Sequence, residues 1–275
     1  MGLLEGKVAL ISGIGGGQGR AAALVFAREG ARVFGCDINR DSAEETVEMV
    51  RKAGGEMRSA HPCNLTDPAQ AAAWIKACHD HWGDFDILYN NAASLQIYGS
   101  FADSKLEDWN QNLQHELTIV YICSHAAWPY FVKRGRGVIL NVASIVAHRE
   151  IFPSRSAGHS AAKAGVLAMT RMLAIEGAPH GIRALSISPG LIRSAATRHF
   201  WSNEPREVAK RDIFISKIPA GRAGECEEVA EVAAFVVSDR ASYINATDII
   251  VDGGLIGTSF GCYSNLPGSD DILSH

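Results

Sequence analysis

Short runs of apolar, often β-branched residues alternate along the chain with longer segments in which apolar positions recur every three or four residues. Runs of the first kind, bounded by turn residues, are typical of buried strands, and the longer segments are typical of amphipathic helices. The strand-like runs are Val8–Ser12, Arg32–Cys36, Asp86–Tyr89, Gly137–Val142, Arg183–Ser188 and Asp248–Val251. Their alternation with helices predicts βαβ units and a parallel sheet.

The helix-like segments lie between these runs, at Arg20–Glu29, Ser42–Ala53, Leu106–Lys133, Gly158–Glu176 and Glu225–Val237. A helix that connects two parallel strands covers one face of their sheet. We therefore predict an α/β fold, a Rossmann-type doubly wound parallel sheet of about seven strands with helices on both faces.

One segment departs from the alternation. Gly190–Pro219 lies between a strand and the next helix, and it is rich in Arg, His, Phe and Trp. Long irregular inserts in compact domains are usually functional or mobile. Because no Pro/Gly/Ser-rich linker divides the chain, we predict one domain over residues 1–257, with a substrate insert at 190–219, and a C-terminal tail at 258–275.

Composition narrows the class of partner. The net charge of −4 comes from 26 basic and 30 acidic residues spread along the chain, so no basic field is present to bind a nucleic acid. The sequence has neither a long uncharged apolar stretch nor a secretory signal, so we expect no membrane partner. The six cysteines form no C-x-x-C pair, which predicts reduced thiols and no metal site. We expect a cytoplasmic protein that binds a small molecule.

A glycine-rich turn follows the first strand and precedes the first helix. Glycine lets the backbone turn tightly and approach a pyrophosphate closely, and a helix N-terminus offers free N–H groups and the positive end of a dipole. A glycine cluster at this position predicts a dinucleotide site. The residues that would form it are Gly13, Gly15, Gly17, Gln18 and Gly19.

Asp37 ends the second strand, roughly twenty residues beyond the glycine turn. A carboxylate there accepts hydrogen bonds from the ribose hydroxyls of adenosine and repels a 2′-phosphate. No lysine or arginine lies between Gly13 and Gly19 to bind an extra phosphate. Both features predict NAD as the cofactor in preference to NADP.

The chain from about Glu5 to Gly257 resembles the short-chain dehydrogenase/reductase family. Ser12-Gly13-x-x-x-Gly17-x-Gly19 is similar to the family's T-G-x-x-x-G-x-G, and Asp252-Gly253-Gly254 closes the last strand as it does in the family. The resemblance implies a homodimer or homotetramer. It also implies further cofactor contacts in the adenine turn Cys63–Asp67, in Asn90-Asn91-Ala92-Ala93 and in the nicotinamide segment Pro189–Ser194, with Asn64, Leu65, Asn90, Ala92, Lys163, Pro189, Gly190, Ile192 and Ser194 as the binding residues.

The catalytic positions match the family only in part. Ser144 matches the serine that holds the substrate oxygen, and Lys163 matches the lysine that binds the nicotinamide ribose. Four residues before Lys163, where the family has its tyrosine, the chain has His159. Counting along the preceding helix places Glu116 at the family's asparagine position, although a shifted alignment would place Asn112 there.

These residues leave several functions open. An imidazole exchanges protons near neutral pH, so His159 can replace the tyrosine as acid or base. The leading interpretation is an NAD-dependent oxidoreductase for a secondary alcohol or ketone, with Ser144, His159 and Lys163 at the reacting centre and Glu116 paired with Lys163. One alternative is a lyase, hydrolase or isomerase that retains NAD and uses His159 as acid and base. Another is a catalytically impaired NAD-binding protein. A true triad is disfavoured, because the asparagine position of this fold faces the lysine more than the tyrosine.

Overall fold

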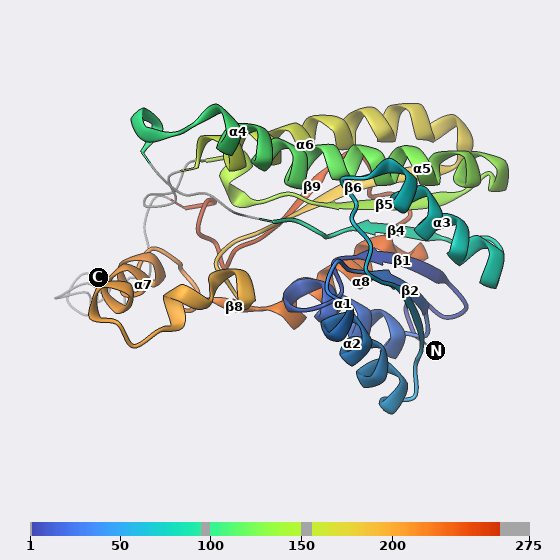
Figure 1. Ribbon diagram of the computed structural model, residues 1–275, viewed down its shortest axis with the longest axis horizontal. Helices are drawn as coiled ribbons and strands as arrows, with labels where there is room; N and C mark the ends of the chain where they lie inside the picture. The colour runs from blue at the N-terminus through green and yellow to red at the C-terminus, as the bar shows by residue number, and fades with distance from the viewer. Residues whose placement is uncertain (1, 95–99, 150–155, 259–275) are drawn as a thin grey trace, which may run out of the picture.

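The computed structural model describes residues 2–94, 100–149 and 156–258. Within these residues, one parallel sheet has the strand order β3-β2-β1-β4-β5-β6-β9 (Figure 1). Its strands are β1 (Val8–Ser12), β2 (Arg32–Cys36), β3 (Glu56–Ala60), β4 (Ile87–Asn90), β5 (Gly137–Val142), β6 (Ile182–Pro189) and β9 (Asp248–Val251). The strand order reverses between β1 and β4, the topological switch point of a doubly wound sheet. The predicted fold class is confirmed.

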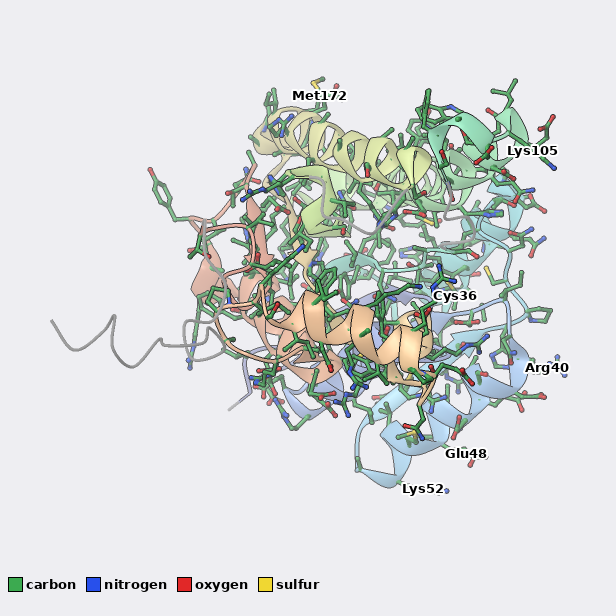
Figure 2. The ribbon with its side chains drawn as sticks, turned by 90° about the vertical axis from the view of Figure 1, so that its left-hand side faces the viewer. Cys36, Arg40, Glu48, Lys52, Lys105 and Met172 are labelled. Atoms are coloured by element: carbon green, nitrogen blue, oxygen red, sulfur yellow. The ribbon has the colours of Figure 1, made fainter. Side chains whose placement is uncertain are left out.

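Helices cover both faces of the sheet (Figure 1). One layer contains α1 (Gly17–Arg28), α2 (Arg40–Lys52) and α8 (Cys226–Val237), and the other contains α3 (Pro68–Trp82), α4 (Leu106–Leu113), α5 (Ile119–Arg134) and α6 (Ala157–Gly177). Charged residues on α2 such as Arg40, Glu48 and Lys52 point away from the sheet into solvent (Figure 2). The apolar side chains of these helices face the strands, as expected for helices that flank a parallel sheet.

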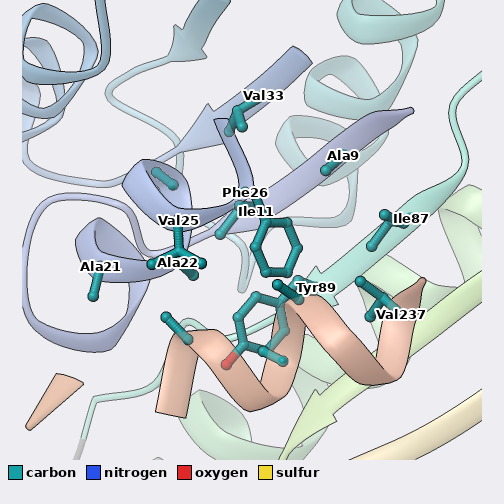
Figure 3. Close-up of a cluster of buried hydrophobic side chains, with 14 of the residues drawn as sticks. Ala9, Ile11, Ala21, Ala22, Val25, Phe26, Val33, Ile87, Tyr89 and Val237 are labelled. Atoms are coloured by element: carbon teal, nitrogen blue, oxygen red, sulfur yellow. The ribbon is translucent and has the colours of Figure 1, made fainter. Parts of the chain in front are cut away.

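Two apolar cores lie on either side of the sheet. In the core beneath α1 and α8, the rings of Phe26 and Tyr89 stack with their centroids 5.9 Å apart (Figure 3). Trp74 and Phe131 are fully buried in the other core, between the sheet and the layer that contains α3 and α5. Burying a large apolar side chain stabilises the fold by about 1.5–3 kcal/mol. The two cores hold the carboxyl ends of the strands in fixed positions.

One strand of the main sheet and one helix that covers it were not predicted. The edge strand β3 has a polar sequence, and only Met57 of its residues is fully buried, so its apolar signal is weak. Helix α3 is rich in alanine, and its apolar stripe is correspondingly faint. The long helix expected at 106–133 is interrupted by a π-helical turn, η2 (Gln114–Thr118), between α4 and α5. Such turns occur frequently at functional sites.

The insert at 190–219 is more regular than predicted. It contains a short strand β7 (Ile192–Arg193) paired with β8 (Gly224–Glu225), a 3₁₀ segment η5 (Ala195–Trp201) and helix α7 (Pro205–Ile215). Pro205 occupies the first turn of α7, where its missing N–H costs no intrahelical hydrogen bond. Phe214 and Ile218 anchor the segment in a small apolar cluster of their own. The prediction of an irregular insert was therefore wrong for most of its length.

The C-terminal tail predicted at 258–275 lies outside the described residues beyond Thr258. Among the helices that the structure describes, none is both long and apolar enough to cross a membrane.

Candidate active site

A cavity of about 1180 Å³ opens at the carboxyl ends of the parallel strands. Its lining combines the glycine turn, the end of β2, the segments after β3 to β6, and part of the insert. The predicted cofactor residues found in this lining are Gly13, Gly15, Gly17, Gln18, Gly19, Asp37, Asn64, Leu65, Ala92, Lys163, Pro189, Gly190, Ile192 and Ser194. The cavity is large enough for a dinucleotide together with a small substrate.

The glycine turn is shaped to leave room for a ligand. Gly13 and Gly17 have φ angles of +72° and +51°, which favour glycine. A Cβ on Gly19 would lie 2.0 Å from the carbonyl oxygen of Gly13, so the helix can approach the strand this closely only without a side chain. Gly16 precedes α1 without a side-chain cap, which leaves the first N–H groups of the helix for an anion. These residues fit a pyrophosphate.

Asp37 is held in place by the backbone. Its Oδ2 accepts a hydrogen bond of 2.7 Å from the N–H of Gly15, and its Oδ1 accepts one of 2.8 Å from the N–H of Asn39. Arg20, the first basic residue after the turn, already donates to the carbonyl of Gly15 at 2.9 Å and pairs with Glu45. The carboxylate therefore faces the cavity with its orientation fixed.

Asn90 lies in the core and not in the cavity lining. It is 3% exposed, and its amide nitrogen donates to Ser124 Oγ at 3.0 Å and to Asn141 Oδ1 at 2.8 Å. The amide nitrogen of Asn141 in turn donates to Thr170 Oγ1 at 2.9 Å. This buried network joins β4, α5, β5 and α6. The side chain of Asn90 is thus part of the core, whereas the next residues, Asn91 and Ala92, line the cavity, and a cofactor contact of Asn90 stays a prediction.

Ser144 and Lys163 both line the cavity. Ser144 begins a 3₁₀ turn after β5, and its Oγ accepts a long hydrogen bond of 3.4 Å from the N–H of Val146. Lys163 comes from α6, is 4% exposed, and donates from Nζ to the carbonyl of Val142 at 3.0 Å. Burial lowers the pKa of Lys163, and the nearby carboxylate of Glu116 opposes that shift.

Glu116 lies in the π-helical turn η2 and is fully buried. Its Oε2 is 2.5 Å from Nδ1 of His159 and 3.9 Å from Nζ of Lys163. The carboxylate thus contacts the histidine more closely than the lysine, contrary to the expectation from the family. Asn112 instead donates to Ser156 Oγ, at the N-cap of α6, over 3.4 Å. Of the two candidate residues, Glu116 is therefore the one that contacts His159 and Lys163.

His159 lies in the first turn of α6, four residues before Lys163. Its side chain is 14% exposed and lines the cavity beside Ser144 and Lys163. Three of the four predicted catalytic side chains thus line one cavity, and Glu116 contacts two of them from behind.

Several lining residues were not predicted. His115 and Ile119 face the cavity from the region of the π-helical turn, and Glu207, Lys210 and Phe214 face it from the insert. The spacing of Glu207, Lys210 and Phe214 is that of one helix face, a signal that is usable only once the insert is known to contain a helix. Among the described residues, no three His, Cys, Asp or Glu side chains are grouped to hold a metal ion.

The known proteins that this chain resembles include reductases and dehydrogenases. A family model described as enoyl-(acyl carrier protein) reductase matches residues 13–256. The chain is 35% identical to a 3-oxoacyl-[acyl-carrier-protein] reductase of Thermotoga maritima, over 92% of this chain and 99% of the relative. It is 34% identical to the cyclohexanol dehydrogenase of Acinetobacter sp. (strain SE19), over 90% and 94% of the two chains. The solved structure of levodione reductase superposes with a TM-score of 0.88 at 29% identity, covering 93% and 99%.

The doubly wound sheet with a glycine turn at its switch point defines a Rossmann-type protein with a dinucleotide site. Together with the matching family model and relatives, it shows that the chain belongs to the short-chain dehydrogenase/reductase family and is an oxidoreductase of that type.

Proposed function

We propose that the protein is an NAD-dependent oxidoreductase that interconverts a secondary alcohol and a ketone. The observation that carries this proposal is that Ser144, His159 and Lys163 line the same cavity as the glycine turn and Asp37. A reacting carbon can therefore lie beside a proton-exchanging side chain and beside the cofactor site at once.

The chain's residues have distinct roles in this proposal. The glycine turn would hold the pyrophosphate of NAD, Asp37 the adenosine ribose, and Lys163 the nicotinamide ribose. Bound NAD supplies the hydride acceptor in oxidation and, as NADH, the hydride donor in reduction. Ser144 Oγ holds the substrate oxygen by a hydrogen bond. His159 takes up or releases the proton of that oxygen at its Nε2, the ring nitrogen that does not face Glu116.

The substrate that we favour is a cyclic secondary alcohol. Ile145, Leu191 and Phe214 give the cavity apolar walls near Ser144, and such walls suit a hydrocarbon ring. Cyclohexanol dehydrogenase, one of the relatives, acts on an alcohol of this kind by its name. The assembly that we propose is a homodimer or homotetramer, and its location is the cytoplasm, where the five described cysteines would remain the free thiols that they are in the structure.

The direct test measures NADH formation and substrate loss in parallel, on a panel of cyclic alcohols and ketones, for the native protein and for His159→Phe. We expect native turnover with equal NADH formation and alcohol loss. Phenylalanine keeps a ring but exchanges no proton, so the variant is expected to lose on the order of 100-fold or more in kcat. Native-like turnover by His159→Phe would contradict the proposed role.

A second function is favoured by one observation, the contact of His159 with a buried carboxylate. A histidine oriented by a glutamate and near a serine can also activate a nucleophile for ester hydrolysis or a related non-redox reaction. Substrate loss without net NADH change in the same assay would support this function. NADH binding without any substrate loss would support a catalytically impaired NAD-binding protein.

A further inference from the structure

Glu116 and His159 reach each other from different elements. Glu116 belongs to the π-helical turn η2, and His159 belongs to the first turn of α6, whose N-cap Ser156 accepts a hydrogen bond from the N–H of His159 at 3.3 Å. Both ends of the contact are therefore held by their own helices. The two side chains are buried or nearly so, unlike those of a flexible ion pair on the surface.

The contact with Glu116 restricts the position of the hydrogen on the imidazole. An ionised carboxylate only accepts hydrogen bonds, so the ring nitrogen beside it must carry the hydrogen. Nδ1 of His159 lies 2.5 Å from Oε2 of Glu116, and this carboxylate is 0% exposed. Nε2 is then the unprotonated nitrogen of the neutral ring, and it is the nitrogen left for the cavity.

The same oxygen of Glu116 also forms an ion pair with Lys163. Nζ of Lys163 lies 3.9 Å from Oε2, while Oε1 of Glu116 has no hydrogen-bond partner among the described residues. A buried charge is tolerated only when nearby groups compensate it. Both compensating groups, an imidazole N–H and an ammonium, come from one face of α6.

We propose that Glu116 is a positioning residue that fixes the tautomer and the orientation of His159, so that positions 116 and 159 work only as a matched pair. This inference rests on the proposed function, in which His159 exchanges the proton. A tyrosine at 159 would lie beside a buried carboxylate, which disfavours the ionised phenol and draws its O–H away from the cavity. A histidine opposite an amide at 116 would lose its fixed tautomer.

The first test follows the tautomer and needs no turnover. The protein is labelled with ¹⁵N-histidine, and the signal of His159 is assigned by its absence in His159→Phe. We expect the Nδ1–H tautomer in the native protein and its loss in Glu116→Gln, whose amide keeps the shape but can also donate. A native ring that carries its hydrogen on Nε2, or a Glu116→Gln spectrum identical to the native one, would overturn the proposal.

The second test is a four-protein cycle of the native chain, Glu116→Asn, His159→Tyr and the double variant, assayed for hydride transfer. We expect each single change to lower kcat by roughly 100-fold, which is the lower end of general acid–base effects. The kcat of the double variant should be higher than that of either single variant. If the fold-loss of kcat in the double variant equals the product of the fold-losses in the two single variants, the pairing is contradicted. Ser124→Ala, which removes a buried hydrogen bond from the same helical segment, is the control for unspecific damage.

The two tests separate this inference from the proposed function. If the native tautomer is as expected but neither the native protein nor any variant transfers hydride, the oxidoreductase proposal fails, and Glu116 retains its role in orienting His159 for another reaction. If hydride transfer is present and the tautomer does not respond to Glu116→Gln, the positioning role fails and the oxidoreductase proposal stands.

Discussion

The N–H of Gly15 and the carboxylate of Asp37 are joined by a hydrogen bond of 2.7 Å, which links the glycine turn after β1 to the end of β2. A Cβ on Gly15 would lie 2.9 Å from Cγ of Asp37. The turn and the carboxylate therefore form one rigid wall of the cavity. A 2′-phosphate bound at this wall would meet a fixed negative charge.

Asp37→Asn tests that wall. The amide oxygen can still accept the hydrogen bond from Gly15, but the charge is gone, so we expect weaker NADH binding and stronger NADPH binding. The Kd for NADPH divided by the Kd for NADH, both measured by cofactor fluorescence, should fall by roughly tenfold or more, equivalent to about 1.4 kcal/mol. Asp41→Asn, an exposed change in the first turn of α2, is the control and should leave the ratio unchanged. An unchanged ratio in Asp37→Asn would rule out this origin of cofactor choice.

Gly19→Ala tests the close approach of α1 to the strand. The added methyl would meet the carbonyl oxygen of Gly13, and overpacking of this kind costs about 1–3 kcal/mol of unfolding free energy. Gly16→Ala is the matched control, because its Cβ would meet nothing within 4 Å and its backbone is extended. Urea unfolding should show a loss for the first variant and a change within about 0.5 kcal/mol for the second. Equal losses would mean that the turn is sensitive to any side chain.

Asn90→Leu separates a core role from a cofactor role. The substitution leaves Asn141 Oδ1 and Ser124 Oγ without their donor, so the free energy of unfolding should fall by about 3 kcal/mol. The Kd for NADH of the folded fraction should stay close to the native value, because Asn90 does not line the cavity. A large rise in this Kd with unchanged stability would restore the cofactor contact that the family resemblance implies.

Lys163→Met tests the buried ammonium through pH. Because burial lowers the pKa of Lys163 below its ordinary 10.5, the charged form costs stability at neutral pH, and this cost disappears as pH rises toward 10.5. The native free energy of unfolding minus that of Lys163→Met should therefore increase in urea titrations as the pH rises toward 10.5.

Lys76→Met provides the opposite sign. The hydrogen bond with Asp80 raises the pKa of Lys76. The contribution of Lys76 to the free energy of unfolding should therefore fall as the pH rises through this raised pKa. If the native-minus-variant free energies of unfolding changed with pH in the same direction for Lys163→Met and Lys76→Met, the effect at Lys163 could not be assigned to burial.

Much of the fold could be predicted because its strands are apolar and its glycine turn is local. Six of the strands were located from runs of residues such as those in β5, in which both faces are buried. The polar edge strand β3 and the alanine-rich helix α3 were missed, since each depends on tertiary packing more than on its own pattern. The same holds for α7, which is stabilised by a cluster that its sequence does not reveal.

The site was predicted less completely, for a geometric reason. Counting along helices places His159 and Lys163 on one face of α6, since they are four residues apart. It does not say how near Glu116 comes to either, because a π-helical turn shifts the register of its helix and the contact joins residues 43 positions apart. The alternation of side chains along β4, and not its motif, likewise decides that Asn91 and not Asn90 lines the cavity.

The fully buried carboxylate of Glu116 also bears on ancestry. Starting from a family member with tyrosine and asparagine at these two positions, acquiring the glutamate first would bury a charge next to a phenol, whereas acquiring the histidine first would set a neutral ring beside a neutral amide. In the first order the new carboxylate would have only the ammonium of Lys163, 3.9 Å away, as its partner, whereas in the second order the imidazole is already in place when the charge is acquired. Living descendants of that intermediate, with histidine at the tyrosine position and asparagine still in the helix, are therefore the relatives that we expect to find in sequence surveys.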